Sequence, residues 1–135
     1  MRVRVAFVDD SIVEIEIEGG YDDLDELADA LRNGRGTITC DTSGDPAPYA
    51  AAVGSLVIET NDDDRVRFHA DESSVRIVGG TDRCEELAEM VDDLADGAFG
   101  THVHVEWYPN HTMIGKGSIP AVLALPRPTG ASVEP

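Results

Sequence analysis

One order of strand and helix patterns occurs twice in this chain, and this repetition constrains the fold more than any other feature. The segments 11–40 and 74–107 each contain an alternating strand pattern, a double glycine, an acidic helix pattern and a further strand pattern. Placing Gly20 on Gly80 aligns these elements in the same order. The placement also pairs Leu27 with Leu87 and Ala28 with Ala88, and with four extra residues allowed in the second helix segment it pairs Gly36 with Gly100 and Thr37 with Thr101. We interpret the chain as a tandem duplication.

Each copy predicts two strands, a helix and two further strands. The strands are expected at residues 2–7, 11–18, 37–40, 55–60, 65–69, 74–78, 101–107 and 118–125. Each helix has one apolar stripe, formed by Leu24, Leu27, Ala28 and Leu31 in the first and by Cys84, Leu87, Ala88, Val91, Leu94 and Ala95 in the second. Neither copy can bury its apolar face alone, so we expect both to share one core.

The expected architecture is therefore α+β: an antiparallel sheet with two amphipathic helices against it, related by a pseudo-twofold axis. Residues 1–125 are predicted to form a single domain made of two repeats, 1–60 and 61–125. The segment 126–135 has the composition of a disordered tail.

The charge balance is the most informative bulk property. The chain has 27 Asp and Glu residues against 10 Lys and Arg, a formal net charge of −17, and its single lysine is Lys116. Such self-repulsion opposes compaction in dilute buffer and is screened in molar salt. Asp92, Asp93 and Asp96 lie at the C-terminal end of a helix pattern, where the helix dipole disfavours acids. These features favour a protein of an extreme halophile with molar salt in its cytoplasm, and an ordinary acidic protein is the alternative.

The net negative charge argues against nucleic-acid and membrane partners, and other sequence features indicate the cellular location. A nucleic-acid backbone requires clustered Lys or Arg, and an anionic membrane is disfavoured for the same reason. Neither a long apolar run nor a signal-peptide pattern is present, so we expect a cytoplasmic protein. Cys40 and Cys84 are then expected to be reduced, buried thiols.

The known catalytic and phosphate-binding motifs are not found. The double glycines precede helix patterns, but both helix starts are rich in acid, which would repel phosphate, so we interpret the glycines as turn formers. Ser118 has no nucleophile-elbow motif around it. The acids of 61–64 are interpreted as a solvated turn rather than a cation site. An enzyme is therefore less expected than a binding protein.

One histidine cluster suggests a metal site. His102, His104 and Glu106 alternate along an expected strand and would share one face, and His111 lies a short loop away. Imidazoles and a carboxylate are suitable ligands for Zn²⁺ or another divalent metal, and an open position would allow hydrolysis by an activated water. The alternative is a solvated sheet face without metal. The aligned positions of the first copy, Ile38, Cys40 and Thr42, preserve no ligand set.

Two long loops, 41–54 and 108–117, follow equivalent strands and are expected at comparable positions. They carry aromatic and flexible apolar residues of the kind found in partner-binding surfaces. The candidates are Tyr49, Tyr108, His111, Met113 and Ile114. The alternative is that these loops pack against their own sheet.

The C-terminal half, over residues 74–125, resembles one known family. Gly-Thr-His-Val-His-Val-Glu-Trp at 100–107 and Gly-Ser-Ile at 117–119 are similar to the H-x-H strand and the final Gly-Ser strand of the immunity proteins numbered thirty-two in polymorphic toxin systems. The resemblance implies a non-enzymatic protein that neutralises a toxin by binding it. No individual binding residue is carried over.

Three function classes follow. The first is a protein-binding module, of the immunity or inhibitor type. The second is a divalent-metal-binding protein or metal-dependent hydrolase that uses the H-x-H-x-E strand. The third is a structural homodimer formed through the exposed sheet.

Overall fold

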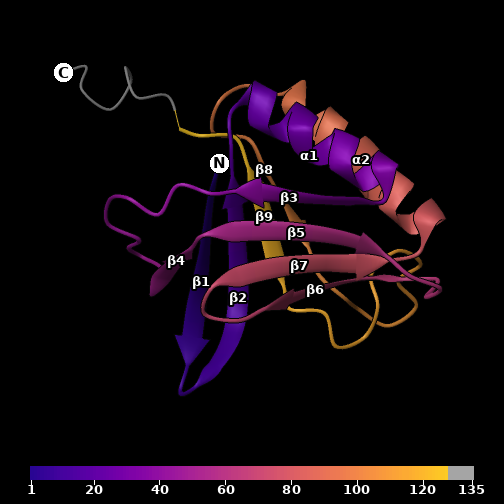
Figure 1. Cartoon of the computed structure of the whole chain (residues 1–135), viewed down its shortest axis with the longest axis horizontal. Helices are drawn as coiled ribbons and strands as arrows, with labels where there is room; N and C mark the ends of the chain where they lie inside the picture. Colours follow the sequence, from indigo (N-terminus) through magenta and orange to yellow (C-terminus); the bar gives the residue numbers. More distant parts are fainter. Residues whose placement is uncertain (128–135) are drawn as a thin grey trace.

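The structure, a computed structural model, describes residues 1–127. Nine strands and two helices follow one another along the chain (Figure 1). Their bounds are β1 (Arg2–Val8), β2 (Ser11–Glu18), α1 (Tyr21–Asn33), β3 (Arg35–Thr39), β4 (Ala51–Val53), β5 (Ser55–Thr60), β6 (Val66–Ala70), β7 (Ser74–Gly79), α2 (Thr81–Ala95), β8 (His102–Val105) and β9 (Ala121–Ala124). The predicted tail at 126–135 lies, from residue 128 onward, outside the described residues.

The strands form two mixed sheets, so the α+β class is confirmed and the expectation of one antiparallel sheet is wrong. One sheet, sheet A, has the order β4-β1-β2-β9-β8, and the other, sheet B, has the order β3-β5-β7-β6. In Figure 1 the strands of sheet B run across those of sheet A. Five strand pairs are antiparallel, three of them between consecutive strands, whereas β2–β9 and β5–β7 are parallel and join strands that are not consecutive.

The two sheets share one pattern of strand pairing. The half of the chain that supplies the hairpin in one sheet supplies the strands beside the hairpin in the other. In sheet A, the hairpin β1–β2 pairs through β2 with β9, and β9 pairs with β8. In sheet B, the hairpin β6–β7 pairs through β7 with β5, and β5 pairs with β3. Each half therefore supplies a hairpin to one sheet and two of the strands that follow its helix to the other.

These ladders also define which residues are equivalent. Val122 pairs with Glu16 and His104, and Val57 pairs with Arg76 and Thr37. His104 is thus equivalent to Thr37, and not to Cys40 as the glycine alignment suggested. The glycine alignment is correct for β2 and β7 but shifts the strand after each helix by three residues.

The loop at 41–54 contains a strand, β4, that the sequence did not reveal. β4 pairs with the outer edge of β1. The loop at 106–120 makes the corresponding contact with β6, because Ile114 bridges Val66 and the Val66 amide donates to the Met113 carbonyl at 2.8 Å. Both loops therefore cover an exposed hairpin edge, which would otherwise present unpaired backbone groups.

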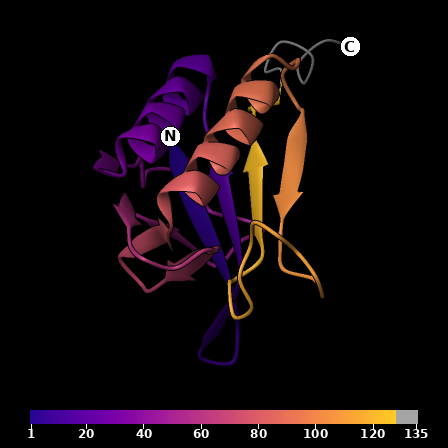
Figure 2. The same cartoon turned by 90° about the vertical axis from the view of Figure 1, so that its right-hand side faces the viewer.

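The two helices lie side by side as one layer (Figure 2). α1 ends at Gly34, whose φ of 81° is the left-handed conformation that glycine adopts easily. Both helices begin directly after a glycine, with Gly20 and Gly80 at the N-cap positions. A Cβ on Gly80 would lie 2.2 Å from the Asp63 carbonyl oxygen, so close backbone approach explains this glycine better than turn formation does.

Both sheets and both helices contribute to one core. The helix stripes are buried as predicted, except that Ala95 is only partly buried, and fully buried strand residues include Ile15, Ile17, Leu56 and Ile77. Cys40 and Cys84 are buried free thiols, and burial raises the pKa of both. Among the described residues, no helix is long and apolar enough to span a bilayer.

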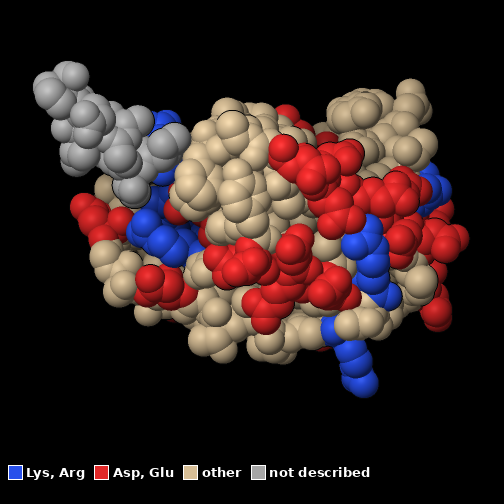
Figure 3. Space-filling view, turned by 90° about the horizontal axis from the view of Figure 1, so that it is seen from above, with Lys and Arg blue, Asp and Glu red and all other residues tan. Residues whose placement is uncertain are grey.

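The acidic residues gather on the outer side of the helix layer (Figure 3). Within the two helices, Arg32 and Arg83 are the only basic residues. Arg32 pairs with Glu85 and Asp92, which links α1 to α2, and Arg83 pairs with Glu86. The last turn of α2 contains no basic residue to offset its acids.

Candidate functional site

The predicted histidine pair lies on β8, the last strand of sheet A. His102 and His104 are both exposed, and their ring centroids are 5.5 Å apart in an edge-to-face arrangement. Val105 points to the core with 2% of its surface exposed, as the strand pattern predicted. β8 ends at Val105, so Trp107 does not enter the core; it is 37% exposed, with the Lys116 ammonium 5.9 Å from its ring centroid.

The parallel pairing of β2 with β9 places a row of carboxylates opposite these histidines. Glu16 and His104 flank Val122, and Glu18 and His102 flank Ala124 on the same face. Two strand spacings separate the rows, about 10 Å. A hollow of about 330 Å³, which we call the trough, lies between them, with Val122 and Ala124 at its base. Glu14 and Tyr49 also line it.

An ion pair and a tyrosine fix the carboxylate side of the trough. Arg4, 8% exposed, pairs with Glu16, and the Tyr49 ring centroid lies 5.2 Å from the Arg4 guanidinium carbon. The Tyr49 hydroxyl donates a hydrogen bond of 2.8 Å to Glu14. Burial, and then this hydrogen bond, raise the pKa of Tyr49, so the phenol stays protonated. Glu18 has no side-chain partner within residues 1–127.

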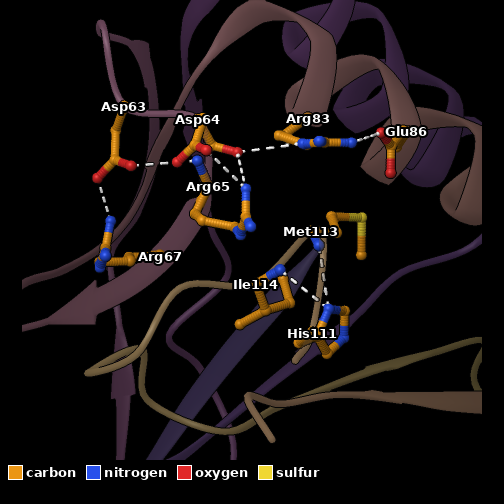
Figure 4. Close-up of polar contacts among 9 residues, drawn as sticks. All are labelled: Asp63, Asp64, Arg65, Arg67, Arg83, Glu86, His111, Met113 and Ile114. Atoms are coloured by element: carbon orange, nitrogen blue, oxygen red, sulfur yellow. Dashed lines mark hydrogen bonds and ion pairs between the residues drawn. The ribbon is translucent and has the colours of Figure 1, made fainter. Parts of the chain in front are cut away.

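The four predicted metal ligands are only partly brought together. Glu106 lies beyond the end of β8. His111 is held elsewhere, because its Nδ1 accepts hydrogen bonds from the amides of Met113 and Ile114 at 3.1 and 3.2 Å (Figure 4). Within the part of the chain that the structure describes, no three His, Cys, Asp or Glu side chains are close enough to hold a metal ion. The histidine pair remains as a candidate for two of the ligands.

The predicted partner-binding residues divide into exposed and buried ones. Tyr108 is 58% exposed, and its ring centroid lies 4.4 Å from that of the half-buried His111. Met113 and Ile114 are 6% and 0% exposed, because their segment bridges to the edge of β6. Met113 and Ile114 therefore follow the alternative, in which the loop packs against its own sheet, and partner binding by the loop residues stays a prediction.

Arginine side chains form ion pairs and a hydrogen bond with the acidic turn at 61–64, which fits its interpretation as a turn rather than a cation site. Asp63 pairs with Arg67, Asp64 pairs with Arg65, and the Asp64 carbonyl accepts a hydrogen bond from Arg83 (Figure 4). A larger hollow, about 720 Å³, lies along β3 and β5 and contains none of the predicted site residues. The trough therefore gathers more of the candidate residues than this larger hollow does.

Sequence reasoning found the histidine side of the trough and missed the carboxylate side. The alternation over 11–18 showed that Glu14, Glu16 and Glu18 share a face. Nothing in that pattern shows which strand lies beside β2, so their position opposite the histidines was not visible. The role of Arg4 was missed for the same reason.

Residues 74–128 match the family model for immunity protein 32. The predicted resemblance of the C-terminal half is thereby confirmed. The matched segment runs from β7 through α2, β8 and β9, so it contains the histidine side and the base of the trough. No curated protein and no solved structure matches the chain.

Proposed function

We propose that this protein is a non-enzymatic, protein-binding module of the immunity or inhibitor type, which neutralises a protein toxin by binding it. The observation that carries the proposal is the match of residues 74–128 to immunity protein 32. Such proteins act through a surface and require no catalytic group, which fits a chain without a recognisable nucleophile or acid–base motif.

The trough and its surroundings are the surface that best fits this role. Carboxylates, imidazoles and small apolar side chains alternate across β2, β9 and β8, so polar contacts surround an apolar base. Tyr49 lies at this face, and Tyr108 and His111 follow β8 along the chain. We propose these three as partner contacts of the two loops. The net charge of −17 favours a partner with a basic surface.

Divalent-metal binding is the second candidate, and the proximity of His102 and His104 favours it. Two exposed imidazoles on alternate strand positions can both approach one Zn²⁺ ion. A partner, a second copy or water would have to supply the remaining ligands, because residues 1–127 bring no third ligand near. Hydrolysis by such a site would need an open coordination position.

We further propose that the chain works in the cytoplasm of a halophile. The acids over both helices, with few basic neighbours, support this setting (Figure 3). Molar salt would screen their mutual repulsion, and a salt-dependent melting point is the test.

We also propose a single domain that arose by tandem duplication. The exchanged pairing of the two halves supports both ideas, because β2 and β5 each need a partner strand from the second half. A fragment of residues 1–60 alone should then be unfolded by circular dichroism. A protein made of two copies of residues 61–127 should fold; a folded 1–60 fragment would contradict the single domain, and an unfolded double copy would contradict the duplication.

The test of function is growth rescue. A candidate toxin is sought among the products of the genes that neighbour this one. Cells that express it should stop growing, and co-expression of this protein should restore their growth. A matched chain with the core substitution Ile17→Asp, which should not fold, serves as the control. Continued growth arrest despite abundant folded protein would overturn the proposed function.

A further inference from the structure

Within residues 1–127, β8 presents an unpaired backbone edge at the end of sheet A. The Ile15 and Gly19 amides donate to the carbonyls of Pro120 and Ala124, so the even-numbered residues of β9 direct their backbone groups toward β2. The odd-numbered residues therefore face β8, and the Leu125 amide donates to Thr101 at 2.9 Å. Because hydrogen-bonded pairs alternate along an antiparallel ladder, the amides and carbonyls of His102 and His104 point away from β9.

The other hairpin edges of the described chain are covered. β4 pairs with β1, and the segment around Ile114 bonds to β6. The comparable free edge is β3, where Thr37 is equivalent to His104. Apart from the three-residue β4, which itself ends sheet A, each sheet thus has one strand with a free edge, β8 or β3, and these two edges differ in their surroundings.

Exposed aromatic side chains flank β8 and not β3. Phe99 precedes β8 and is 46% exposed, while Trp107 and Tyr108 follow it at 37% and 58%. Such residues are enriched at protein interfaces, where they provide large contact areas at a small entropic cost. All three lie within the segment that matches the immunity family. The stretch from 97 to 105 contains no Asp, Glu, Lys or Arg, which is unusual in a chain of net charge −17.

We propose that β8 is a docking edge at which an extended, basic segment of the protein partner is added to sheet A as a further strand. The backbone groups of His102 and His104 would bond the added strand, and Phe99, Trp107 and Tyr108 would contact it at both ends. Its alternate side chains would lie beside the imidazoles on the outer face, with the carboxylates of the trough beyond them. This inference rests on the proposed function.

Charge selects a basic partner over a second copy of this chain. Two copies would each carry a net charge of −17. A symmetric antiparallel pairing of β8 with itself would also place His102 opposite His104 of the other copy, so four imidazoles would crowd one face. A basic segment meets neither obstacle and is attracted by Glu14, Glu16, Glu18 and Glu106.

The test uses the full chain and the purified toxin encoded beside its gene, in molar KCl. His104→Pro removes the outward amide and leaves the β8–β9 ladder intact, since proline is tolerated at an edge position whose N–H faces away. His104→Thr removes the imidazole and keeps the amide. Thr37→Pro makes the same backbone change at the equivalent position of β3, and thermal melting checks that all variants fold.

We expect His104→Pro to raise the dissociation constant at least tenfold relative to His104→Thr, which lacks the same imidazole but keeps the amide, and Thr37→Pro to change it less than threefold relative to the wild-type chain. Amide hydrogen exchange at 101–105 should slow in the complex of the wild-type chain, while that at 35–39 should not. Toxin binding with unchanged exchange at 101–105 and normal affinity of His104→Pro would overturn the docking edge and leave the proposed function standing. No binding by the wild-type chain would overturn both, and a dimer of the free chain that His104→Pro dissociates would replace the partner by a second copy.

Discussion

The Arg4 guanidinium pairs with the Glu16 carboxylate on the outer face of sheet A, and Arg4 is the one charged side chain buried among the described residues. The pair forms part of the carboxylate side of the trough, and the Tyr49 ring lies against the Arg4 guanidinium. The pair joins β1 to β2 within the hairpin of the first half, and β2 is the strand beside which β9 of the second half lies.

Replacing Arg4 should destabilise the protein. Arg4→Met leaves the half-buried Glu16 carboxylate without its partner, and we expect a loss of about 2–3 kcal/mol in the free energy of unfolding by urea. The control is Arg76→Met, which breaks the exposed pair with Glu59 and should cost less than about 1 kcal/mol. Equal losses in the free energy of unfolding for the two variants would show that the Arg4–Glu16 pair stabilises the fold no more than an exposed pair does.

Tyr49 should titrate at a higher pH than an ordinary tyrosine does. Burial and the hydrogen bond to Glu14 raise its pKa in the folded state, so its neutral form is favoured by folding. The stability that it contributes is present below the ordinary tyrosine pKa of about 10 and is lost as the pH rises above that value. Ultraviolet titration of the phenolates should show one late tyrosine that is missing in Tyr49→Phe, and three coincident titrations would contradict the burial.

The metal alternative has its own test. Protein purified in high salt without chelator is examined by elemental analysis, together with the His102→Ala/His104→Ala double variant. If the pair binds metal, zinc, manganese or iron should be present in the wild-type chain and lost in the variant. Metal that is absent, or that the substitution leaves unchanged, would assign the two histidines to the protein-binding face alone.

Salt should stabilise the fold strongly. We expect the melting temperature in molar KCl to exceed that in dilute buffer by about 10 °C, which corresponds to roughly 2–3 kcal/mol for a chain of this size. The Asp93→Lys/Asp96→Lys variant reduces the repulsion at the C-terminal end of α2, so its melting temperature should depend less on salt. A melting temperature that is the same in both buffers would rule out the halophile setting.

The sequence predicted local structure well and long-range pairing poorly. Both hairpins, both helices and their buried stripes follow from side-chain periodicity, which the chain itself determines. The parallel neighbours β2–β9 and β5–β7 do not, because an alternating pattern identifies the buried face of a strand but not the strand beside it. β4 was missed because Ala51 and Ala52 are small and follow a proline-rich loop.

In the candidate site, too, the sequence predicted local structure better than long-range contacts. His102 and His104 were correctly placed on one face, since alternate strand residues share a face. Trp107 was misplaced because the strand ends two residues before it. Met113 and Ile114 were taken for an exposed loop surface, and only the bridge to Val66 explains why such apolar residues are buried there.

The most direct test of the central claim is titration calorimetry of the purified chain with the toxin encoded beside its gene, in molar KCl. The account predicts a 1:1 complex with a dissociation constant below about 1 μM, since neutralisation requires binding at low cellular concentrations. The absence of binding heat between two folded proteins, supported by separate elution in size-exclusion chromatography, would contradict it.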